Sequence, residues 1–245
     1  MCGAQEPTGL DPSAALFLDF DGTLIDIASS PARVRVPPEL PRLLLKLRKE
    51  RGGALAVLSG RPLAELDRLL APWRGAAAGL HGSERRRADG QIACGPDART
   101  ARALSRLRPR LEAFAARDPR LFLEDKGGAL ALHCRSVPQY EAELRALGES
   151  LEREEGGALR VIAGKMVIEF ASARADKGAA IEAFLREPPF RGRVPVFLGD
   201  DVTDEDGFAA VNRRGGISIR VGPPQETQAR FHLHSVGAVL SWLDP

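Results

Sequence analysis

Two early segments of the chain are almost entirely apolar, which is typical of strands that helices cover on both faces. The first, 15–20, ends in acidic residues, and the second, 54–58, runs into Ser59-Gly60-Arg61. Continuous apolarity, rather than alternation, predicts parallel strands in a buried sheet. Leucines at helical spacing predict helices over 40–47 and 63–70, and a third strand is expected at 76–80. This alternation of strand and helix predicts an α/β fold with a doubly wound, Rossmann-like core.

The order of elements changes between about Pro96 and Ala171. Apolar residues at helical spacing predict one helix around 101–111, which Pro109 should kink or divide, and a second over 138–153. Two short strands are expected around Gly127-Gly128 and two more around Ala163-Gly164. The order α-β-β-α-β-β is that of an antiparallel sheet with helices on one face. We therefore predict an inserted α+β cap domain at 96–171, within a core formed by 1–95 and 172–245.

The strand–helix alternation returns after the insert. Asp176 should cap a helix that extends to about Leu185, and a buried strand at 194–199 should end in Asp200-Asp201. Thr203 is expected to cap a short helix with acidic residues in its first turn. A strand over 216–221 and a last apolar helix ending near Leu243 complete the predicted core.

Composition excludes several classes of function. The 245 residues are 44% hydrophobic and 28% charged, and the formal net charge is only +2. Such a balance, with 5% aromatic residues, does not favour nucleic-acid binding. No segment approaches the roughly 20 apolar residues that span a bilayer, and no signal peptide is recognised. Three scattered cysteines predict neither a disulfide framework nor a metal cluster. We expect a cytoplasmic protein without a nucleic-acid or membrane partner.

Polar residues follow three of the predicted strands, at 19–23, 59–61 and 200–204. In an open α/β sheet, ligands bind beyond the carboxyl ends of the strands, so these residues should share one edge. Lys177 begins a helix that could reach the same edge. The resulting set of two acids, hydroxyls, a lysine and an acidic pair is suited to a phosphate substrate.

Each residue of this set has a chemical reason to be present. Asp19 could attack phosphorus and form an acyl phosphate, while Asp21 could protonate the leaving oxygen and then deprotonate water. A divalent cation is needed between these acids and a phosphate dianion, and Mg²⁺ prefers such hard oxygen ligands. We expect Asp19, the main-chain carbonyl of Asp21, and Asp200 to hold Mg²⁺.

The remaining polar residues at this edge could hold the phosphoryl group. Hydroxyl groups and a lysine can stabilise the charge that develops on the transferring group. The predicted phosphate-binding residues are Thr23, Ser59, Gly60 and Lys177, and Asp201 or Asp204 could hold the lysine in place. Lys177 could instead be a solvated residue at a helix start, and the acids could cap turns or helices.

The run Asp19-Phe20-Asp21-Gly22-Thr23-Leu24 resembles the first motif of the haloacid dehalogenase superfamily of phosphatases, and Ser59, Lys177 and Asp200-Asp201 match the other motifs in order. The chain also resembles the trehalose-6-phosphate phosphatases over about 16–242. The matching stretches are 58–61, 79–84, 124–127, 131–135, 164–169 and 197–205. The resemblance implies hydrolysis of trehalose 6-phosphate to trehalose and phosphate, with the insert closing over the sugar. It also implies that Arg61 and Glu84 contact the substrate.

Alternation within the insert predicts a polar sheet face. Apolar residues of 129–135 and 165–170 share one face, which leaves charged residues on the other. Mixed charges that both donate and accept hydrogen bonds suit an uncharged disaccharide, although any solvated sheet face is also polar. The predicted sugar-contacting residues of the insert are Glu124, Lys126, Arg135, Lys165 and Glu169. His133 could be structural or functional, and the same holds for His81.

Alternatives to this hypothesis remain open at the level of sequence. A related phosphatase could act on another sugar phosphate, of the sucrose or mannosylglycerate type, with the same core chemistry. A phosphomutase is conceivable on this core, and a domain that binds a sugar phosphate without turnover belongs to another class. The presence of both Asp19 and Asp21 speaks against the latter. We expect a monomer, and the resemblance allows for functional pairing with a trehalose-6-phosphate synthase.

Overall fold

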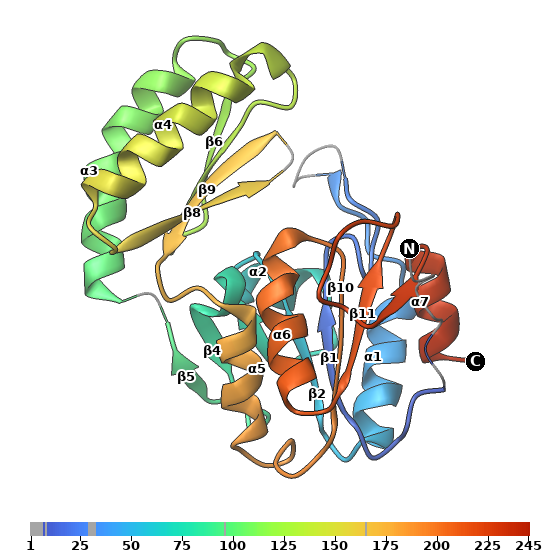
Figure 1. The fold of residues 1–245 in the computed structure, drawn as a ribbon. Helices are drawn as coiled ribbons and strands as arrows, with labels where there is room; N and C mark the ends of the chain where they lie inside the picture. Colours follow the sequence, from blue (N-terminus) through green and yellow to red (C-terminus); the bar gives the residue numbers. More distant parts are fainter. Residues whose placement is uncertain (1–6, 8, 29–32, 96, 165) are drawn as a thin grey trace. The chain divides into compact units, whose positions relative to one another are not determined.

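The computed structural model describes the chain except for residues 1–6, 8, 29–32, 96 and 165 (Figure 1). It divides into two compact units. We call Met1–Ala93 with Asp176–Pro245 the core unit, and Cys94–Ala175 the inserted unit. Among the described residues, none of the helices has the length and apolar character needed to cross a membrane.

The core unit is built on an eight-stranded sheet with the order β12-β11-β10-β1-β2-β3-β4-β5. The six strands from β12 to β3 pair in parallel, and β4 pairs antiparallel with β3. The strands are β1 (Ala15–Asp19), β2 (Leu55–Leu58), β3 (Ala76–Gly79), β4 (Glu84–Arg86), β5 (Ile92–Cys94), β10 (Pro195–Gly199), β11 (Ile217–Val221) and β12 (Phe231–Leu233).

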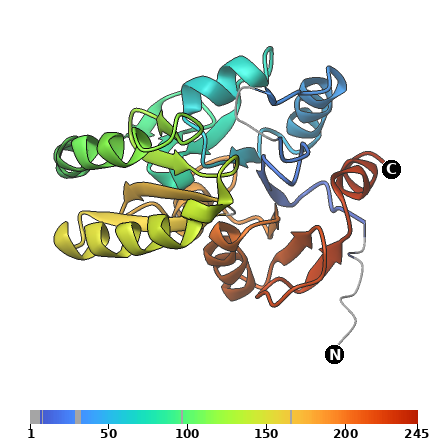
Figure 2. The same cartoon turned by 90° about the horizontal axis from the view of Figure 1, so that it is seen from above.

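Helices cover both faces of this sheet, as the continuous apolar strands require. Leu16 and Leu18 of β1 pack in one hydrophobic cluster, and Phe17 between them packs in another. The first cluster includes residues of α1 and α7, the second residues of α5 and α6, and α1 and α6 lie on opposite sides of the sheet (Figure 2). The helices are α1 (Glu39–Glu50), α2 (Leu63–Leu69), α5 (Lys177–Leu185), α6 (Glu205–Arg213) and α7 (Val236–Leu243). The predicted doubly wound α/β core is confirmed.

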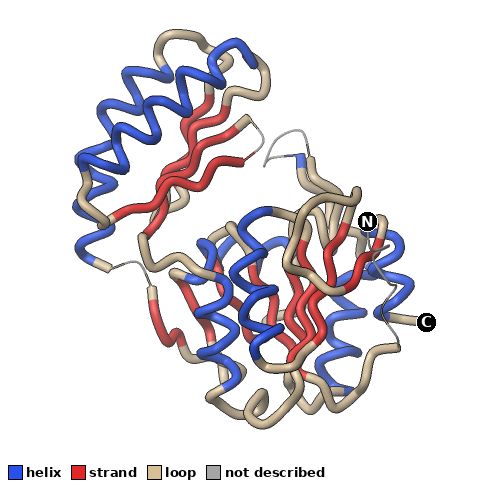
Figure 3. Tube along the Cα trace, viewed as in Figure 1, coloured by secondary structure: helices blue, strands red, loops and turns tan. Residues whose placement is uncertain are grey.

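The inserted unit is a four-stranded antiparallel sheet with two helices on one face (Figure 3). Alternate residues of its strands, such as Leu132 and Phe170, pack with helix residues such as Leu111 and Leu151 in one hydrophobic cluster. The elements are α3 (Ala98–Ala115), β6 (Phe122–Asp125), β7 (Leu130–His133), α4 (Glu141–Glu154), β8 (Leu159–Gly164) and β9 (Val167–Ser172), and the strand order is β6-β7-β9-β8. The predicted order α-β-β-α-β-β is therefore correct.

Several local predictions were wrong. Helix α3 runs without interruption through Pro109, so that proline does not divide it. Thr203 does not cap α6; it lies inside the short 3₁₀ helix Val202–Asp204, whose capping residue is Asp201. Ala163 and Gly164 end β8 rather than forming the turn after it. The short strands β4, β5 and β12 were missed, because three residues are too few to show a period.

Candidate active site

The predicted polar residues of the core unit meet at one edge of the sheet. β1 lies between β2 and β10, and all three strands run parallel. Asp19 is the last residue of β1, Ser59 directly follows β2, and Asp200 directly follows β10. Because the carboxyl ends of neighbouring parallel strands lie at the same edge, three segments far apart in the sequence supply one site.

Lys177 is a buried ammonium held between two carboxylates. It is the first residue of α5, which Asp176 caps by accepting a hydrogen bond from the Ala179 N–H. Its Nζ donates to Asp19 Oδ1 and to Asp204 Oδ1, both at 2.6 Å. Lys177 is 2% exposed and Asp204 is fully buried. Burial alone would lower the pKa of Lys177, but the charges of Asp19 and Asp204 outweigh it, so the pKa is raised and the lysine is charged.

Asp204 uses both of its carboxylate oxygens within the site. While Oδ1 accepts from Lys177, Oδ2 accepts the backbone N–H groups of Asp200 at 3.0 Å and Asp201 at 2.9 Å. Asp204 therefore positions both the lysine and the loop that carries Asp200. The two residues predicted to support the site thus differ, because Asp204 contacts the lysine and Asp201 caps the following 3₁₀ helix.

Three carboxylates gather at this edge around that one ammonium. Oxygens of Asp19, Asp200 and Asp204 all lie within 4.8 Å of one another. Burial, and then the charges of Asp204 and Asp200, raise the pKa of Asp19 well above its usual range in spite of Lys177. Burial, with Asp204 and Asp201, raises the pKa of Asp200 to about 7. Three carboxylates thus share one ammonium group, and when all three are ionised their negative charge exceeds what the described residues balance.

This excess charge fits a divalent cation. Asp19 Oδ2 is buried and has no hydrogen-bond partner among the described residues. Asp200 accepts a long hydrogen bond of 3.5 Å from the Thr23 hydroxyl, whereas both oxygens of Asp204 already accept hydrogen bonds. Asp19 and Asp200 are thus the side chains suited to bind a hard metal ion. Asp21, the third predicted ligand, was expected to contribute only its main-chain carbonyl.

Gly22 allows Asp200 to approach the loop after β1. Its φ of 87° lies in the left-handed region, and a Cβ at this position would lie 2.0 Å from Asp200 Oδ2. A side chain here would be strained by the backbone and would displace the Asp200 carboxylate. Gly22 is therefore required because the Asp200 carboxylate occupies the space that a side chain would need.

The Asp21 carboxylate is paired with Arg61. Arg61 donates from Nε to Asp21 Oδ2 at 2.6 Å and from Nη2 to Asp21 Oδ1 at 2.7 Å, and Nη1 reaches Glu65 at 2.5 Å. Two parallel hydrogen bonds of this kind fix the orientation of both groups. Arg61, predicted to contact the substrate, therefore also controls the predicted acid/base. The Ser59 hydroxyl is buried and accepts the Arg61 backbone N–H at 3.1 Å.

The segment after β3 packs against the loop after β2, whose Ser59 and Gly60 are predicted to bind phosphate. Leu80 and His81 have φ values of 47° and 55°, which are strained for residues other than glycine. This backbone brings the His81 ring so close to Gly60 that a Cβ there would lie 2.6 Å from Nε2. Sequence reasoning did not select His81, although its position between glycines was a signal. Glu84, predicted to bind substrate, accepts the Leu63 N–H at the start of α2 at 2.8 Å.

The predicted polar face of the inserted unit carries one ion pair and one hydrogen bond between a histidine and a carboxylate. Lys126 lies 2.6 Å from Glu169, and His133 Nε2 lies 2.9 Å from Glu124 Oε2. Burial would raise the pKa of Glu124, but the hydrogen bond from His133 and the charge of Lys126 outweigh it, so the pKa is lowered. Arg135 is exposed just after β7, and the predicted Lys165 lies outside the described residues.

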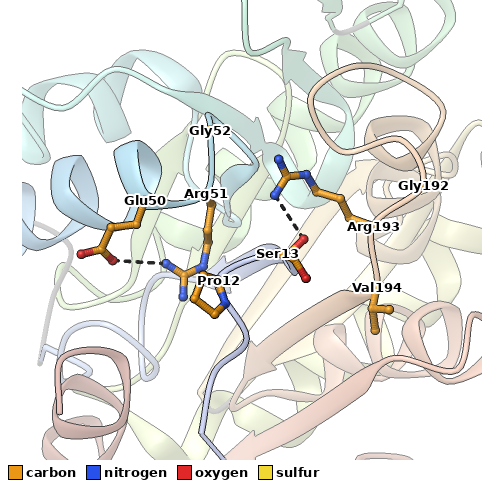
Figure 4. A pocket seen from close by; sticks show the side chains of 8 residues that line it. All are labelled: Pro12, Ser13, Glu50, Arg51, Gly52, Gly192, Arg193 and Val194. Carbon is orange, nitrogen blue, oxygen red and sulfur yellow. Dashed lines mark hydrogen bonds and ion pairs between the residues drawn. The ribbon is translucent and has the colours of Figure 1, made fainter.

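A cavity of about 530 Å³ lies at the opposite edge of the core sheet, before β1, β2 and β10 (Figure 4). Arg51 lies 3.6 Å from Glu50, and Arg193 donates to the Ser13 carbonyl at 3.1 Å. The five residues of β1 separate this edge from Asp19 by about 15 Å. The cavity is therefore distinct from the carboxylate cluster.

Comparison with known proteins agrees with this geometry. A model of the trehalose-phosphatase family matches residues 17–236. The chain belongs to the trehalose-phosphatase family. A probable trehalose-phosphate phosphatase of Sinorhizobium fredii is 48% identical over 210 residues, which are 86% of this chain and 78% of that protein. The trehalose-6-phosphate phosphatase of Escherichia coli is 44% identical over 241 residues, 98% of this chain and 88% of that protein.

Solved structures share the fold. A trehalose-6-phosphate phosphatase related protein, 27% identical, aligns with a TM-score of 0.76 over 93% of this chain and 94% of that chain. A phosphatase of the haloalkanoate (HAD) superfamily from Bacteroides thetaiotaomicron, 19% identical, has a TM-score of 0.61 and covers 93% and 91%. The predicted family, superfamily fold and phosphatase class are confirmed. Phosphatases of this superfamily generally depend on a metal ion, which suits the carboxylate cluster.

Proposed function

We propose that this member of the trehalose-phosphatase family hydrolyses trehalose 6-phosphate to trehalose and phosphate, through a phosphorylated Asp19. One observation carries the proposal. Lys177 donates to one oxygen of the Asp19 carboxylate and to Asp204 Oδ1, both at 2.6 Å. A carboxylate held in a fixed orientation beside an ammonium group that can neutralise phosphoryl oxygens is suited to attack phosphorus.

The first step transfers the phosphoryl group to the protein. An oxygen of Asp19 forms a bond to phosphorus while the bond from phosphorus to the sugar oxygen breaks. Asp21 gives its proton to the leaving oxygen, so that trehalose departs as a neutral alcohol. In the structure both Asp21 oxygens accept from Arg61, at 2.6 and 2.7 Å, so Asp21 must leave this pair and take up a proton from solvent before it can act as the acid. Arg61 thus links substrate entry to release of the acid.

The second step returns the protein to its starting state. Asp21, now ionised, accepts a proton from a water molecule that attacks phosphorus. The bond between Asp19 and phosphorus breaks, and inorganic phosphate leaves. Lys177, Ser59, Thr23 and the backbone at Gly60 hold the phosphoryl oxygens in both steps. Lys177 suits this role because Asp19 and Asp204 orient its ammonium group.

Mg²⁺ is the metal that we propose for the carboxylate cluster, with Asp19, Asp200 and the main chain of Asp21 as its ligands. When bound, Mg²⁺ neutralises charge between the carboxylates and the phosphate. The fit rests on the oxygens of Asp19, Asp200 and Asp204 within 4.8 Å of one another and on the buried Asp19 Oδ2, which has no hydrogen-bond partner among the described residues.

We assign sugar recognition to the inserted unit, as a cap domain at about 96–171. Its polar face gathers Glu124, Lys126 and Glu169, which together offer donors and acceptors to hydroxyl groups. Arg135 and Lys165 are included on the family resemblance, as are Arg61 and Glu84 in the core unit. This face carries carboxylates as well as cations, which favours an uncharged sugar over a second phosphate.

We also propose that the chain acts as a cytoplasmic monomer, beside a synthase that makes trehalose 6-phosphate. Size-exclusion chromatography with light scattering tests the monomer, and co-purification tests the synthase partner.

Phosphate release from a panel of sugar phosphates tests the activity. Wild type should prefer trehalose 6-phosphate, and EDTA should abolish turnover until Mg²⁺ is restored. Asp19→Asn should lose turnover and the phosphorylated peptide that mass spectrometry finds after a rapid acid quench. Asp206→Asn, an exposed carboxylate in the first turn of α6, is the matched control and should keep both.

The outcomes separate the parts of the proposal. If wild type prefers a sucrose or mannosylglycerate phosphate and Asp19→Asn loses this activity, the proposed mechanism stands and the proposed substrate is wrong. Binding of trehalose 6-phosphate without release of phosphate would contradict the proposed enzymatic activity and indicate a sugar-phosphate sensor. Full turnover by Asp19→Asn would contradict the assignment of Asp19 as the nucleophile.

A further inference from the structure

Phe122 is an exposed aromatic residue on the polar face of the inserted unit. It is the first residue of β6 and is 53% exposed. Of the six large hydrophobic side chains that the described part of the chain exposes, it is the aromatic one. Its neighbour Leu123 points to the other face and packs against the hydrophobic cluster. An uncovered aromatic side chain beside charged groups therefore needs an explanation other than core packing.

A second ring extends the surface of Phe122. His133 lies directly opposite Phe122 in the pairing of β6 with β7. The centroids of the two rings are 5.6 Å apart, and the ring planes are inclined by 31°. The two rings are thus neighbours on one face of the sheet, with their planes tilted relative to each other.

Hydrogen-bonding groups border these rings. The register places Glu124, Ala131 and Glu169 in one row across β6, β7 and β9, next to the row of Phe122 and His133. His133 Nε2 lies 2.9 Å from Glu124, which fixes both the imidazole and the carboxylate. Lys126 pairs with Glu169 at 2.6 Å in the same region. An exposed aromatic ring and its histidine neighbour thus lie beside acceptors and a donor held in fixed positions.

We propose that Phe122 and His133 form a stacking platform for one pyranose ring of the substrate, and that this platform sets the specificity for a sugar phosphate. A pyranose has an apolar face of C–H groups and a rim of hydroxyls. The C–H face packs on the rings, while the rim reaches the carboxylates and the ammonium of the neighbouring row. The ligand class is an uncharged hexose ring, because the bordering groups include two carboxylates, Glu124 and Glu169, which would repel a second phosphate. The inference rests on the proposed function and names the residues that discriminate the sugar.

Phe122 and His133 have separate roles in this platform. Phe122 supplies most of the contact area, because it is 53% exposed, and His133 adds its ring to the platform and also orients Glu124. Burying about 60 Å² of ring surface against a sugar corresponds to about a tenfold gain in affinity. Loss of the ring should therefore raise KM for trehalose 6-phosphate about tenfold, with a small effect on kcat.

The test compares selectivity in full-length variants. The ratio of kcat/KM for trehalose 6-phosphate to that for glycerol phosphate, which lacks a sugar ring, is measured in wild type, Phe122→Ala, Phe122→Leu and Phe122→Tyr. Ile92→Ala is the control, since Ile92 is 61% exposed on β5 of the core unit. We expect the ratio to fall about tenfold in Phe122→Ala, to fall less in Phe122→Leu, and to be retained in Phe122→Tyr and Ile92→Ala.

A spectroscopic readout separates stacking from a structural effect. Protons that lie over an aromatic face move upfield in the NMR spectrum, so trehalose C–H signals should shift in the presence of wild type and Phe122→Tyr. They should not shift with Phe122→Leu, which keeps an apolar side chain and the fold. An unchanged selectivity ratio in Phe122→Ala, or equal shifts with Phe122→Leu, would overturn the platform. If wild type itself does not hydrolyse trehalose 6-phosphate, the proposed function fails first, and the variants are not needed to show it.

Discussion

Replacing Asp204 by asparagine tests whether this buried carboxylate organises the site. The side chain keeps its shape in Asp204→Asn, but only one of its two polar atoms can still accept hydrogen bonds. Asp204 Oδ1 accepts from Lys177 at 2.6 Å, and Oδ2 accepts from the backbone of Asp200 and Asp201. Whichever way the amide is turned, its NH₂ group therefore faces a donor.

The loss in free energy of unfolding caused by Asp204→Asn is expected to be large because Asp204 and Lys177 are buried. Asp204 is fully buried and Lys177 is 2% exposed, so solvent screens the pair little. Breaking a buried ion pair costs about 3–5 kcal/mol, and because Lys177 keeps Asp19 as a partner we expect about 3 kcal/mol. For a unit of 163 residues (93 from Met1–Ala93 and 70 from Asp176–Pro245) this corresponds to a fall in Tm of about 6–12 °C.

The assay should report on the core unit alone. Both tryptophans of the chain, Trp73 and Trp242, lie in that unit, so their fluorescence follows its unfolding in urea. Measurements in EDTA remove any contribution from a bound metal. We expect the free energy of unfolding to fall by about 3 kcal/mol and kcat with Mg²⁺ to fall about 100-fold, because Lys177 is displaced. Asp206→Asn is the control.

A loss of less than about 1 kcal/mol in Asp204→Asn, with kcat retained, would refute this reasoning. Such a result would mean that Lys177 is held by Asp19 alone. It would also remove the reason for assigning Asp204 a supporting role rather than a metal-binding one.

Three further changes test other contacts. Gly22→Ala should lower the free energy of unfolding by about 1–2 kcal/mol, because the backbone at this position has a φ of 87°. The variant should also lose the rise in Tm that Mg²⁺ gives wild type, since the new Cβ displaces Asp200. Glu84→Ala should cost about 1 kcal/mol in urea unfolding by removing the acceptor for the Leu63 N–H, whereas Glu84→Gln should restore it; equal losses would contradict the capping role. Because folding lowers the pKa of Glu124, its ionised carboxylate stabilises the inserted unit above pH 4.5, and this contribution is lost as the pH falls through the pKa of the folded state. Hydrogen exchange of peptides from 94–175 should show this loss of stability in wild type but not in Glu124→Gln.

Local pattern was enough to predict most elements and the edge that carries the site. The apolar segments that became β1, β2 and β10 needed no partner to be recognised, because strands buried on both faces exclude polar residues. Once those strands were parallel, the positions of Asp19, Ser59 and Asp200 at one edge followed. Alternation likewise predicted that Glu124, His133 and Glu169 would lie opposite the apolar face of the inserted sheet.

Only the tertiary structure decided which of these side chains contact one another. The sequence allowed either Asp201 or Asp204 to hold Lys177, and the backbone turn after β10 selected Asp204. Arg61 contacts Asp21 across 40 positions of sequence, and His133 contacts Glu124 through strand register. A pattern of apolar and polar residues encodes which face is buried, whereas the partner of a charged side chain depends on distances between segments that local sequence does not contain.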